Sequence, residues 1–411
     1  MAIFKQKLVW IGMILLLAVL TVFGAAMMGS VVGIKPKDVP VALVILDQPA
    51  SMPGGGTLAV GELMKQKLTT TNAAMPIKWT LVGSEEEARA GLQDRRYYGA
   101  LIVPADLSAG VASLAGPQPK PATVQIIGND GLNTQASTVV KQGLGQALRM
   151  VSAELSKSML EQIGKRMPQI PTGTVQALLA PIQVHEETVN AAGANNASGN
   201  APGLLTQIMW MGSLVTAMIL FLAGGSAIRA GARRWPVIAM QPVVGIIFTG
   251  VASGFLVWMA GSWYGMELAH TADTALFLWL AGIMFYMLQS TLLNWIGMPA
   301  MAILVLLMFF SMPLLNMAPE FLSETSQTLI YSWTPLRFAA VGMREVMYFG
   351  GLGSASSSAV IVSAIGAGFL ILLLASGFKR GKRSREKMES ATAGRLRRNN
   401  FLDRGVHGEF E

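Results

Sequence analysis

The sequence predicts a polytopic α-helical membrane protein with six transmembrane helices and an extracytoplasmic α/β domain inserted between helices one and two. Composition is the first observation: 52% of the 411 residues are hydrophobic, 13% are charged, and the mean hydropathy is +0.48. These values exclude an ordinary soluble globular protein. The second observation is a set of long apolar runs, since a helix needs roughly 20 apolar residues to cross the hydrocarbon core. The third is a long polar stretch between the first run and the second.

Five of the apolar runs lie in residues 204–378, and none of the five contains Lys, Arg, Asp or Glu. A soluble helix of this length would carry a polar face toward water. We therefore interpret all five as membrane spans. Their expected ranges are 204–228, 237–263, 275–293, 296–315 and 359–378.

The sixth apolar run, residues 8–32, forms most of an N-terminal segment 1–34. The apolar region of a cleavable signal peptide is shorter, roughly 7–15 residues, although Gly24, Ala25 and Ala26 resemble a cleavage site. We interpret the run as an uncleaved transmembrane anchor. Lys5 and Lys7 before it then stay in the cytoplasm.

The distribution of basic residues orients the chain. With both termini inside, the cytoplasmic pieces hold 15 Lys and Arg against 5 acids, whereas 16 Lys and Arg and 18 acids face outward. This asymmetry follows the positive-inside rule and predicts a multi-pass protein of a bacterial plasma membrane with both termini cytoplasmic. We interpret the basic tail 379–411 as a retention signal that contacts membrane lipids. It lacks the interleaved aromatics and the binding module of a nucleic-acid partner.

The domain at residues 35–203 has nearly balanced charge, with 14 Lys and Arg against 13 Asp and Glu. Strand-length apolar runs at 41–46, 77–82, 99–103 and 123–127 are bounded by Pro, Gly or Asp, which is typical of β-strands. Helices are expected between them. Ser84 and Glu87 form a capping box for a helix at 85–95, and Asp106 is a candidate N-cap for a short helix after Pro104. Alternating strands and helices predict a small α/β sheet.

A long amphipathic helix is expected after Gly131, packed either on the sheet or on a second copy of the chain. Its apolar face follows steps of three and four residues, at Val140, Leu144, Leu148, Val151, Leu155, Met159 and Ile163. Pro168 and Pro171 end it. A second amphipathic stretch is expected at 174–189, and residues 191–202 are typical of a flexible linker.

Within the spans, Gly250 and Gly254 form a GxxxG pair, which allows close approach of helices in lipid. The approaching helix belongs either to the same chain or to a second subunit. Long Gly- and Ala-rich helices also contain such pairs by chance.

The segment at about 319–350 is too polar to span the membrane, yet it is amphipathic and aromatic. Pro335 is expected to divide it into two short helices, with the bend buried against the last two spans. Its ordered polar points are Pro335, Arg337, Gly342, Arg344 and Glu345. The segment is either an interfacial loop or a re-entrant outer gate, and Arg344 either reaches lipid phosphate or pairs within the protein.

Catalytic motifs are absent from the sequence, which has no GxxxxGK[ST], GxSxG or HExxH pattern and no cysteine. The three histidines, His185, His270 and His407, are far apart. His185 lies beside Glu186 and Glu187, a pair more typical of a solvated surface than of a metal site. We expect no catalytic residue, no cofactor and no metal site in this chain.

The order of motifs resembles ABC-2 type transporter permeases, in particular the YhgE/Pip (phage infection protein) branch. Three stretches carry the resemblance: VPVALVILDQ at 39–48, YYGALIVPADLSAGVASL at 97–114 and TPLRFAAVGMREVMYFGG at 334–351. The resemblance implies an exporter subunit that pairs as a homodimer or heterodimer and is powered by a separate ABC ATPase. It also implies that the turn with Arg229, Arg233 and Arg234 receives that ATPase, unless these arginines only hold the orientation.

Two functional classes follow. The first is the permease subunit of an exporter that moves hydrophobic or amphipathic cargo, such as lipid, drug or peptide, because uncharged spans suit such cargo. The second is an ATPase-independent surface receptor, or a scaffold for secretion or envelope assembly. The large outer domain favours the second class.

Overall fold

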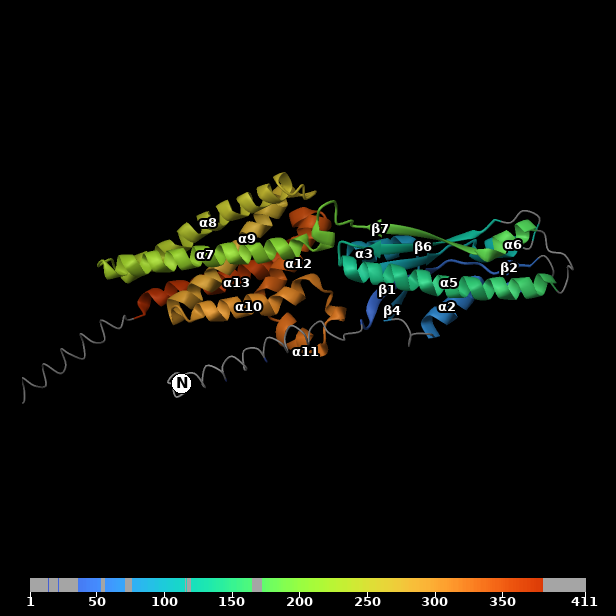
Figure 1. Cartoon of the computed structure of the whole chain (residues 1–411), viewed down its shortest axis with the longest axis horizontal. Coiled ribbons are helices and arrows are strands. Elements are labelled where there is room, and N and C mark those ends of the chain that lie inside the picture. The colour runs from blue at the N-terminus through green and yellow to red at the C-terminus, as the bar shows by residue number, and fades with distance from the viewer. Residues whose placement is uncertain are drawn as a thin grey trace, which may run out of the picture.

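The computed structural model describes residues 36–52, 56–70, 76–114, 116, 120–164 and 172–379, together with Ile14 and Thr21. Two parts lie end to end along the molecule (Figure 1). A domain built on a β-sheet comprises residues 36–199 and is called the sheet domain below. A helical bundle comprises residues 200–378. The predicted anchor at 8–32 and the tail after Lys379 lie outside the described residues.

The sheet domain is organised around a five-stranded sheet in the order β4-β1-β5-β6-β7. Strand β6 runs antiparallel to β5, and the other neighbouring pairs are parallel. The strands are β1 Val39–Ile45, β4 Ile77–Val82, β5 Gly99–Val103, β6 Ala122–Asn129 and β7 Ile182–Val189, with a separate small pair β2 Ala50–Ser51 and β3 Thr57–Leu58. The four strands predicted from the apolar runs are confirmed to within one or two residues.

Strand β7 corrects the expectation of one amphipathic stretch over 174–189. Helix α6 occupies only Thr172–Leu179, and the chain then becomes extended. The strand pairs in parallel with β6 from Ala122↔Ile182 to Asn129↔Val189. Because β7 is an edge strand, most of its side chains are exposed, and its polar sequence gave no apolar run to signal a strand.

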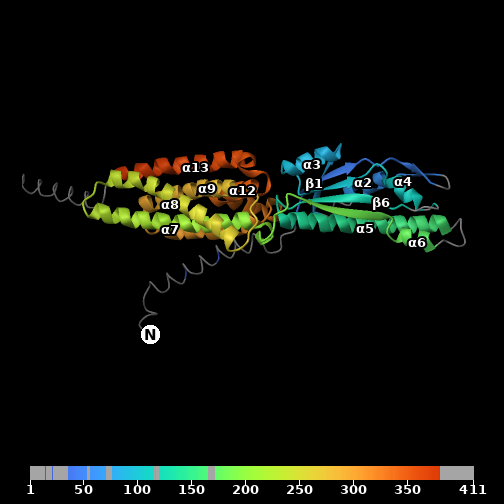
Figure 2. The same cartoon turned by 90° about the horizontal axis from the view of Figure 1, so that it is seen from above.

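Helices cover both faces of the sheet (Figure 2). On one face α2 Val60–Thr70, α4 Leu107–Ser113 and α5 Thr134–Gly164 share a core with β1 and β6. On the other face lies α3 Glu85–Gln93. Half of its predicted capping box forms, since Ser84 Oγ accepts from Glu87 N at 3.2 Å, whereas Glu87 Oε2 accepts at 2.9 Å from N of Gly83, one residue before the N-cap. The expected apolar face of α5 is buried against the sheet from Val140 to Met159.

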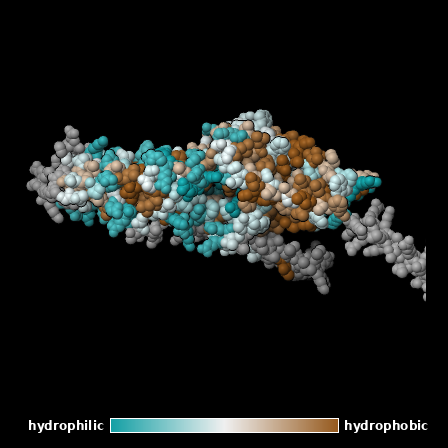
Figure 3. Space-filling view, turned by 180° about the vertical axis from the view of Figure 1, so that it is seen from behind, coloured by the Kyte–Doolittle hydropathy of each residue, from teal (hydrophilic) through white to brown (hydrophobic). Residues whose placement is uncertain are grey.

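The bundle contains α7 Ala201–Arg229, α8 Arg234–Ser262, α9 Thr271–Ile296, α10 Ala300–Asn316, α12 Pro335–Tyr348 and α13 Ser356–Ala375. Among the described residues, the four helices α7, α8, α9 and α13 are long and apolar enough to cross a membrane. Helix α9 is central, since 72% of its most apolar window is buried. The outer surface of the bundle is strongly hydrophobic, whereas the sheet domain is mainly hydrophilic (Figure 3).

Helix α10 is shorter than the span expected at 296–315. Gly297 at φ +86° ends α9, and Pro299 precedes α10, so residues 297–299 form the turn between the two helices. The helix keeps 17 residues. It is an apolar helix below the length of its four long neighbours.

The two glycines of the GxxxG pair lie in different environments. Gly250 lies against Trp279 of α9, whose indole Nε1 donates to the carbonyl of Ile246 at 2.9 Å. Gly254 is exposed, and a Cβ added there would meet nothing within 4 Å. Among the described residues, therefore, Gly250 alone of the pair packs against another helix.

Residues 191–202 were expected to be a flexible linker, but they form an ordered connection. Ala194 N donates to Glu267 Oε2 at 2.8 Å, Asn195 Nδ2 to the Gly265 carbonyl at 3.0 Å, and Asn196 Nδ2 to the Glu267 carbonyl at 2.7 Å. The asparagines typical of a linker are here donors to the α8–α9 loop. That loop lies far away in sequence, which is why composition did not indicate the contact.

Helix α12 lies among the long helices and contacts α7, α9, α10 and α13. Pro335 is its first residue, as predicted, because the missing N–H of proline is tolerated in the first turn of a helix. The preceding short helices, α11 Glu324–Ser326 and a π-helical turn Gln327–Tyr331, are separated from α12 by three residues. Gly342 allows α12 to approach the ring of Phe277 in α9.

We predict that Gly342→Ala destabilises the protein by about 1–3 kcal/mol, the usual cost of overpacking. A Cβ at Gly342 would overlap the ring of Phe277. The control is Gly254→Ala, which has open space and should gain roughly 0.5–1 kcal/mol from the better helix propensity of Ala. The measurement is the thermal unfolding midpoint in detergent, and adding Phe277→Leu to Gly342→Ala should restore part of the loss. Equal midpoints for the two alanine variants would contradict the close contact.

Candidate functional site

The segment between α10 and α12 attaches the bundle to the sheet domain. Ala318 and Phe321 belong to the bundle segment by sequence, yet both are buried in the core of the sheet domain. At the start of this segment the carbonyl of Asn316 accepts a 3.0 Å hydrogen bond from Asn133 Nδ2, just before α5. The two parts therefore share apolar core as well as polar contacts.

Glu320 adds a second connection between the two parts. Its Oε2 accepts a 2.7 Å hydrogen bond from the hydroxyl of Tyr98, just before β5, and its carbonyl accepts one from Lys37 N at 3.3 Å. Burial, together with the Glu320 carboxylate, raises the pKa of Tyr98 well above its ordinary value. The phenol therefore remains a neutral donor at physiological pH.

The ion pair between Arg95 and Glu345 is the third connection. Arg95 has a left-handed φ of +64° in the turn after α3, which is uncommon for a residue with a side chain. Its guanidinium also lies 5.8 Å from the centre of the Phe349 ring and 3.5 Å from the carbonyl of Ser354. The Glu345 side chain is only 9% exposed, so Arg95 supplies the cation that a buried carboxylate requires.

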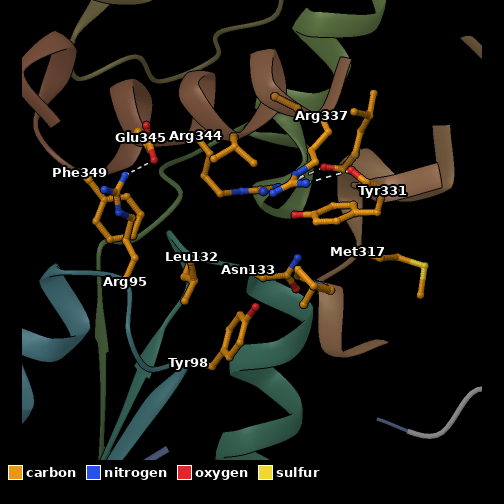
Figure 4. A pocket seen from close by; sticks show the side chains of 15 residues that line it. Arg95, Tyr98, Leu132, Asn133, Met317, Tyr331, Arg337, Arg344, Glu345 and Phe349 are labelled. Carbon is orange, nitrogen blue, oxygen red and sulfur yellow. Dashed lines mark hydrogen bonds and ion pairs between the residues drawn. The ribbon is translucent and has the colours of Figure 1, made fainter. Parts of the chain in front are cut away.

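These connections surround a cavity of about 310 Å³, which we call the junction pocket (Figure 4). The sheet domain and the bundle both line it. Its labelled lining residues are Arg95, Tyr98, Leu132 and Asn133 from the sheet domain and Met317, Tyr331, Arg337, Arg344, Glu345 and Phe349 from the bundle.

Arg337 and Arg344 give the junction pocket its cationic character. Arg337 Nη1 donates to the Tyr331 carbonyl at 3.0 Å, and its guanidinium lies 4.1 Å from the centre of the Tyr331 ring. Arg344 Nη2 makes a long 3.4 Å contact with the carbonyl of Leu315. The guanidinium ends of the two arginines point toward one another near the Tyr331 ring (Figure 4).

The five residues predicted in the segment 319–350 have two different roles in the structure. Arg337, Arg344 and Glu345 line the junction pocket. Pro335 and Gly342 do not line it but position α12, by starting the helix and by allowing its approach to α9. Sequence reasoning missed Arg95 and Tyr98; the Arg-Arg-Tyr-Tyr run at 95–98, in the turn before a buried strand, was the available signal.

The opposite end of the bundle holds Arg229, Arg233 and Arg234. Arg229 is the last residue of α7, and Arg233 and Arg234 begin α8, so a short turn rather than a separate helix joins the spans. Arg234 Nε donates to the carbonyl of Ser376 at 3.2 Å, beyond α13. Arg229 and Arg233 are exposed and are therefore the two available to a partner.

The remaining candidates lie apart from the junction pocket. His185 is exposed on β7, and the neighbouring Glu187 accepts hydrogen bonds from Arg89 at 2.7 Å and from Gln125 at 2.6 Å. The Arg89 guanidinium lowers the pKa of the Glu187 carboxyl. In the part of the chain that the structure describes, there is no cluster of three or more His, Asp or Glu suited to a metal ion.

Of three comparisons with known proteins, the family model alone supports the transport resemblance. A family model described as ABC-2 family transporter protein matches residues 7–375. Among solved structures, a crystal structure of a domain of a candidate ABC type-2 transporter from Thermotoga maritima MSB8 matches with 16% identity, 36% of this chain, 84% of that chain and a TM-score of 0.26. A comparison with curated proteins found no match.

We predict that Arg95→Gln lowers stability by about 1–3 kcal/mol, because it leaves the Glu345 carboxylate buried without its cation. The double variant Arg95→Gln/Glu345→Gln should unfold at a higher temperature than Arg95→Gln alone, since the uncompensated charge is gone. Arg96→Gln is the matched control, because Arg96 is exposed and pairs with Asp94 at 3.3 Å on the surface. Thermal midpoints in detergent measure all three. A double variant that unfolds no higher than Arg95→Gln would argue against the ion pair.

Proposed function

We propose that this chain, which belongs to the ABC-2 family of transporter proteins, is the permease subunit of an exporter powered by a separate ATPase. The observation that carries the proposal is the family match over residues 7–375, which spans nearly the whole chain. The four long apolar helices agree with a multi-pass membrane permease. The order of sequence motifs favours the YhgE/Pip branch.

Exposed aromatic residues support two membrane interfaces on the bundle. Trp258, Trp263, Tyr264 and Trp333 are exposed near the end that meets the sheet domain. Trp235, Trp295 and Phe378 are exposed near the opposite end. Trp and Tyr favour the headgroup level of a bilayer, so the two groups support an interface at each end of the bundle.

The proposed orientation has both termini in the cytoplasm and the sheet domain outside, in the plasma membrane of a bacterium. It counts six spans: residues 8–32, the four long helices and the shorter α10. Basic residues at the N-terminus, in the α7–α8 turn and in the tail support it.

An ATPase would dock at the α7–α8 turn in this orientation. Arg229 and Arg233 are exposed there and suit an acidic groove on a partner. Arg234 is engaged with the end of α13 and so serves the bundle itself.

Hydrophobic or amphipathic cargo suits the bundle best. Three polar side chains inside it form a hydrogen-bonded group: Asn294 Nδ2 donates to Gln241 Oε1 at 2.9 Å, and the Tyr286 hydroxyl donates to the Gln241 carbonyl at 2.8 Å. The lipid-facing side of α8 presents Val243, Ile247 and Val251. This face suits either lipid or a second permease subunit, in a homodimer or heterodimer.

The deciding experiment is affinity purification of the full-length protein in mild detergent. An ATPase with a P-loop should co-elute in stoichiometric amount. If no ATPase co-elutes although the protein is present at its normal level in growing cells, the alternative is favoured, namely a surface receptor or a scaffold for secretion or envelope assembly.

The orientation predicts the reactivity of single cysteines, which are clean probes because the chain has no cysteine of its own. Ser158→Cys, exposed on α5, should react with an impermeant maleimide in intact cells. Ala232→Cys, exposed in the α7–α8 turn, should react only after permeabilisation. The opposite labelling pattern would invert the proposed orientation.

Charge reversal tests the ATPase site. Arg229→Glu/Arg233→Glu should reduce ATPase co-purification at least tenfold, equivalent to about 1.4 kcal/mol, because the turn would repel an acidic groove. The matched control is Arg149→Glu/Lys157→Glu on α5, which reverses the same number of exposed charges at the other end of the molecule. Unchanged co-purification of a correctly inserted Arg229→Glu/Arg233→Glu protein would exclude this turn as the docking site.

A further inference from the structure

We propose that the junction pocket is a binding site for the phosphate group of a phosphate ester. The phosphate belongs either to a lipid headgroup or to a soluble phosphate ester. The site itself follows from the geometry of the pocket, and only the lipid source rests on the proposed function and orientation.

Charge is the first argument. Three guanidinium groups line the pocket, those of Arg95, Arg337 and Arg344. Two carboxylates lie beside these three groups: Glu345 pairs through Oε1 with Arg95, and Glu320 accepts a hydrogen bond from the Tyr98 hydroxyl at 2.7 Å. In the described part of the chain, neither Arg337 nor Arg344 has a carboxylate within ion-pair distance. These two guanidinium groups leave an excess of positive charge around the cavity.

Hydrogen-bonding capacity is the second argument. A guanidinium carries five N–H donors. Arg344 uses one of its nitrogens in a 3.4 Å contact to a carbonyl, and the buried Nε of Arg337 has no partner among the described residues. Arg344 therefore has N–H donors to offer a ligand in the cavity, and the unpaired Nε shows that the described residues do not saturate the Arg337 guanidinium.

Convergence of the two side chains is the third argument. Arg337 starts in the first turn of α12 and Arg344 follows about two turns later, yet their guanidinium ends point toward one another (Figure 4). Like charges held together disfavour one another unless an anion lies between them. A phosphate group has enough oxygens to accept paired hydrogen bonds from two planar guanidinium groups at once. A carboxylate, with only two oxygens, is less suited to this.

The size and walls of the pocket favour an ester over bare phosphate. A cavity of 310 Å³ corresponds to roughly ten water molecules at ~30 Å³ each. This leaves room for a glycerol-sized group beside the phosphate. Leu132, Leu315 and Val341 supply apolar wall, and the hydroxyl-bearing rings of Tyr98 and Tyr331 suit polar substituents.

The location is consistent with access from the membrane surface. The pocket lies where the apolar bundle meets the sheet domain, and α12 begins two residues after the exposed Trp333. In the proposed orientation this is the level of the outer headgroups. A lipid phosphate at that level would reach Arg337 and Arg344 while its acyl chains remain beside the bundle.

The test is equilibrium binding to purified, delipidated full-length protein in a non-ionic detergent, without ATPase or nucleotide. Probes are dihexanoyl phosphatidylglycerol, glycerol 3-phosphate, inorganic phosphate and, as a carboxylate control, hexanoate. We expect saturable binding of at least one phosphate ester, weakened at least tenfold in Arg344→Gln and in Arg337→Gln. Arg149→Gln, which removes an exposed arginine of α5, should bind like the unaltered protein.

Each outcome has a meaning for the site. Binding of the phospholipid alone identifies a lipid headgroup, and comparable binding of glycerol 3-phosphate identifies a soluble ester as a source. Arg344→Lys should retain part of the affinity, which separates loss of the ligand contact from misfolding. Absence of saturable binding, equal affinity for hexanoate, or full affinity in both Arg→Gln variants would overturn the proposal. Because no ATPase is present, failure here is distinct from failure of the exporter proposal.

Discussion

The ion pair between Arg95 and Glu345 is the constraint on which the junction depends. Glu345 lies on α12, where its carboxylate is buried, and the cation that pairs with it comes from the sheet domain. The turn after α3 supplies that cation, with Arg95 in a left-handed conformation that the sheet domain must hold. The position of Arg95 therefore fixes where the sheet domain contacts α12. Arg344, next to Glu345 in the chain, lines the cavity.

The shared core around Ala318 and Phe321 reinforces the same contact. Apolar burial supplies non-directional stabilisation, whereas Asn133 to Asn316 and Tyr98 to Glu320 fix the register of the two parts. With both kinds of contact present, relative movement of the sheet domain and α12 requires breaking polar bonds and exposing apolar surface together. The junction pocket is thus a cavity with fixed walls, which favours selective binding over loose electrostatic attraction.

Charges gather at the two ends of the bundle because the apolar middle excludes them. Gln241, Asn294 and Tyr286, which lie inside the bundle, bond to one another or to backbone carbonyls. Helix α7 connects the two ends physically: it contacts α12 and ends at Arg229.

The sequence by itself determined the elements whose signals are local. Apolar length identified the long helices, strand-length runs identified β1, β4, β5 and β6, and Pro335 marked the start of α12. It also singled out Arg337, Arg344 and Glu345, because charges in an aromatic, amphipathic segment are unusual. Only the tertiary structure decided what these charges meet, since Arg95 and Glu345 are 250 residues apart in the chain and no local pattern joins them. For the same reason only the tertiary structure showed that 182–189 is a strand and that 191–202 is ordered. Both segments are stabilised by hydrogen bonds to residues distant in sequence, which the local sequence does not encode.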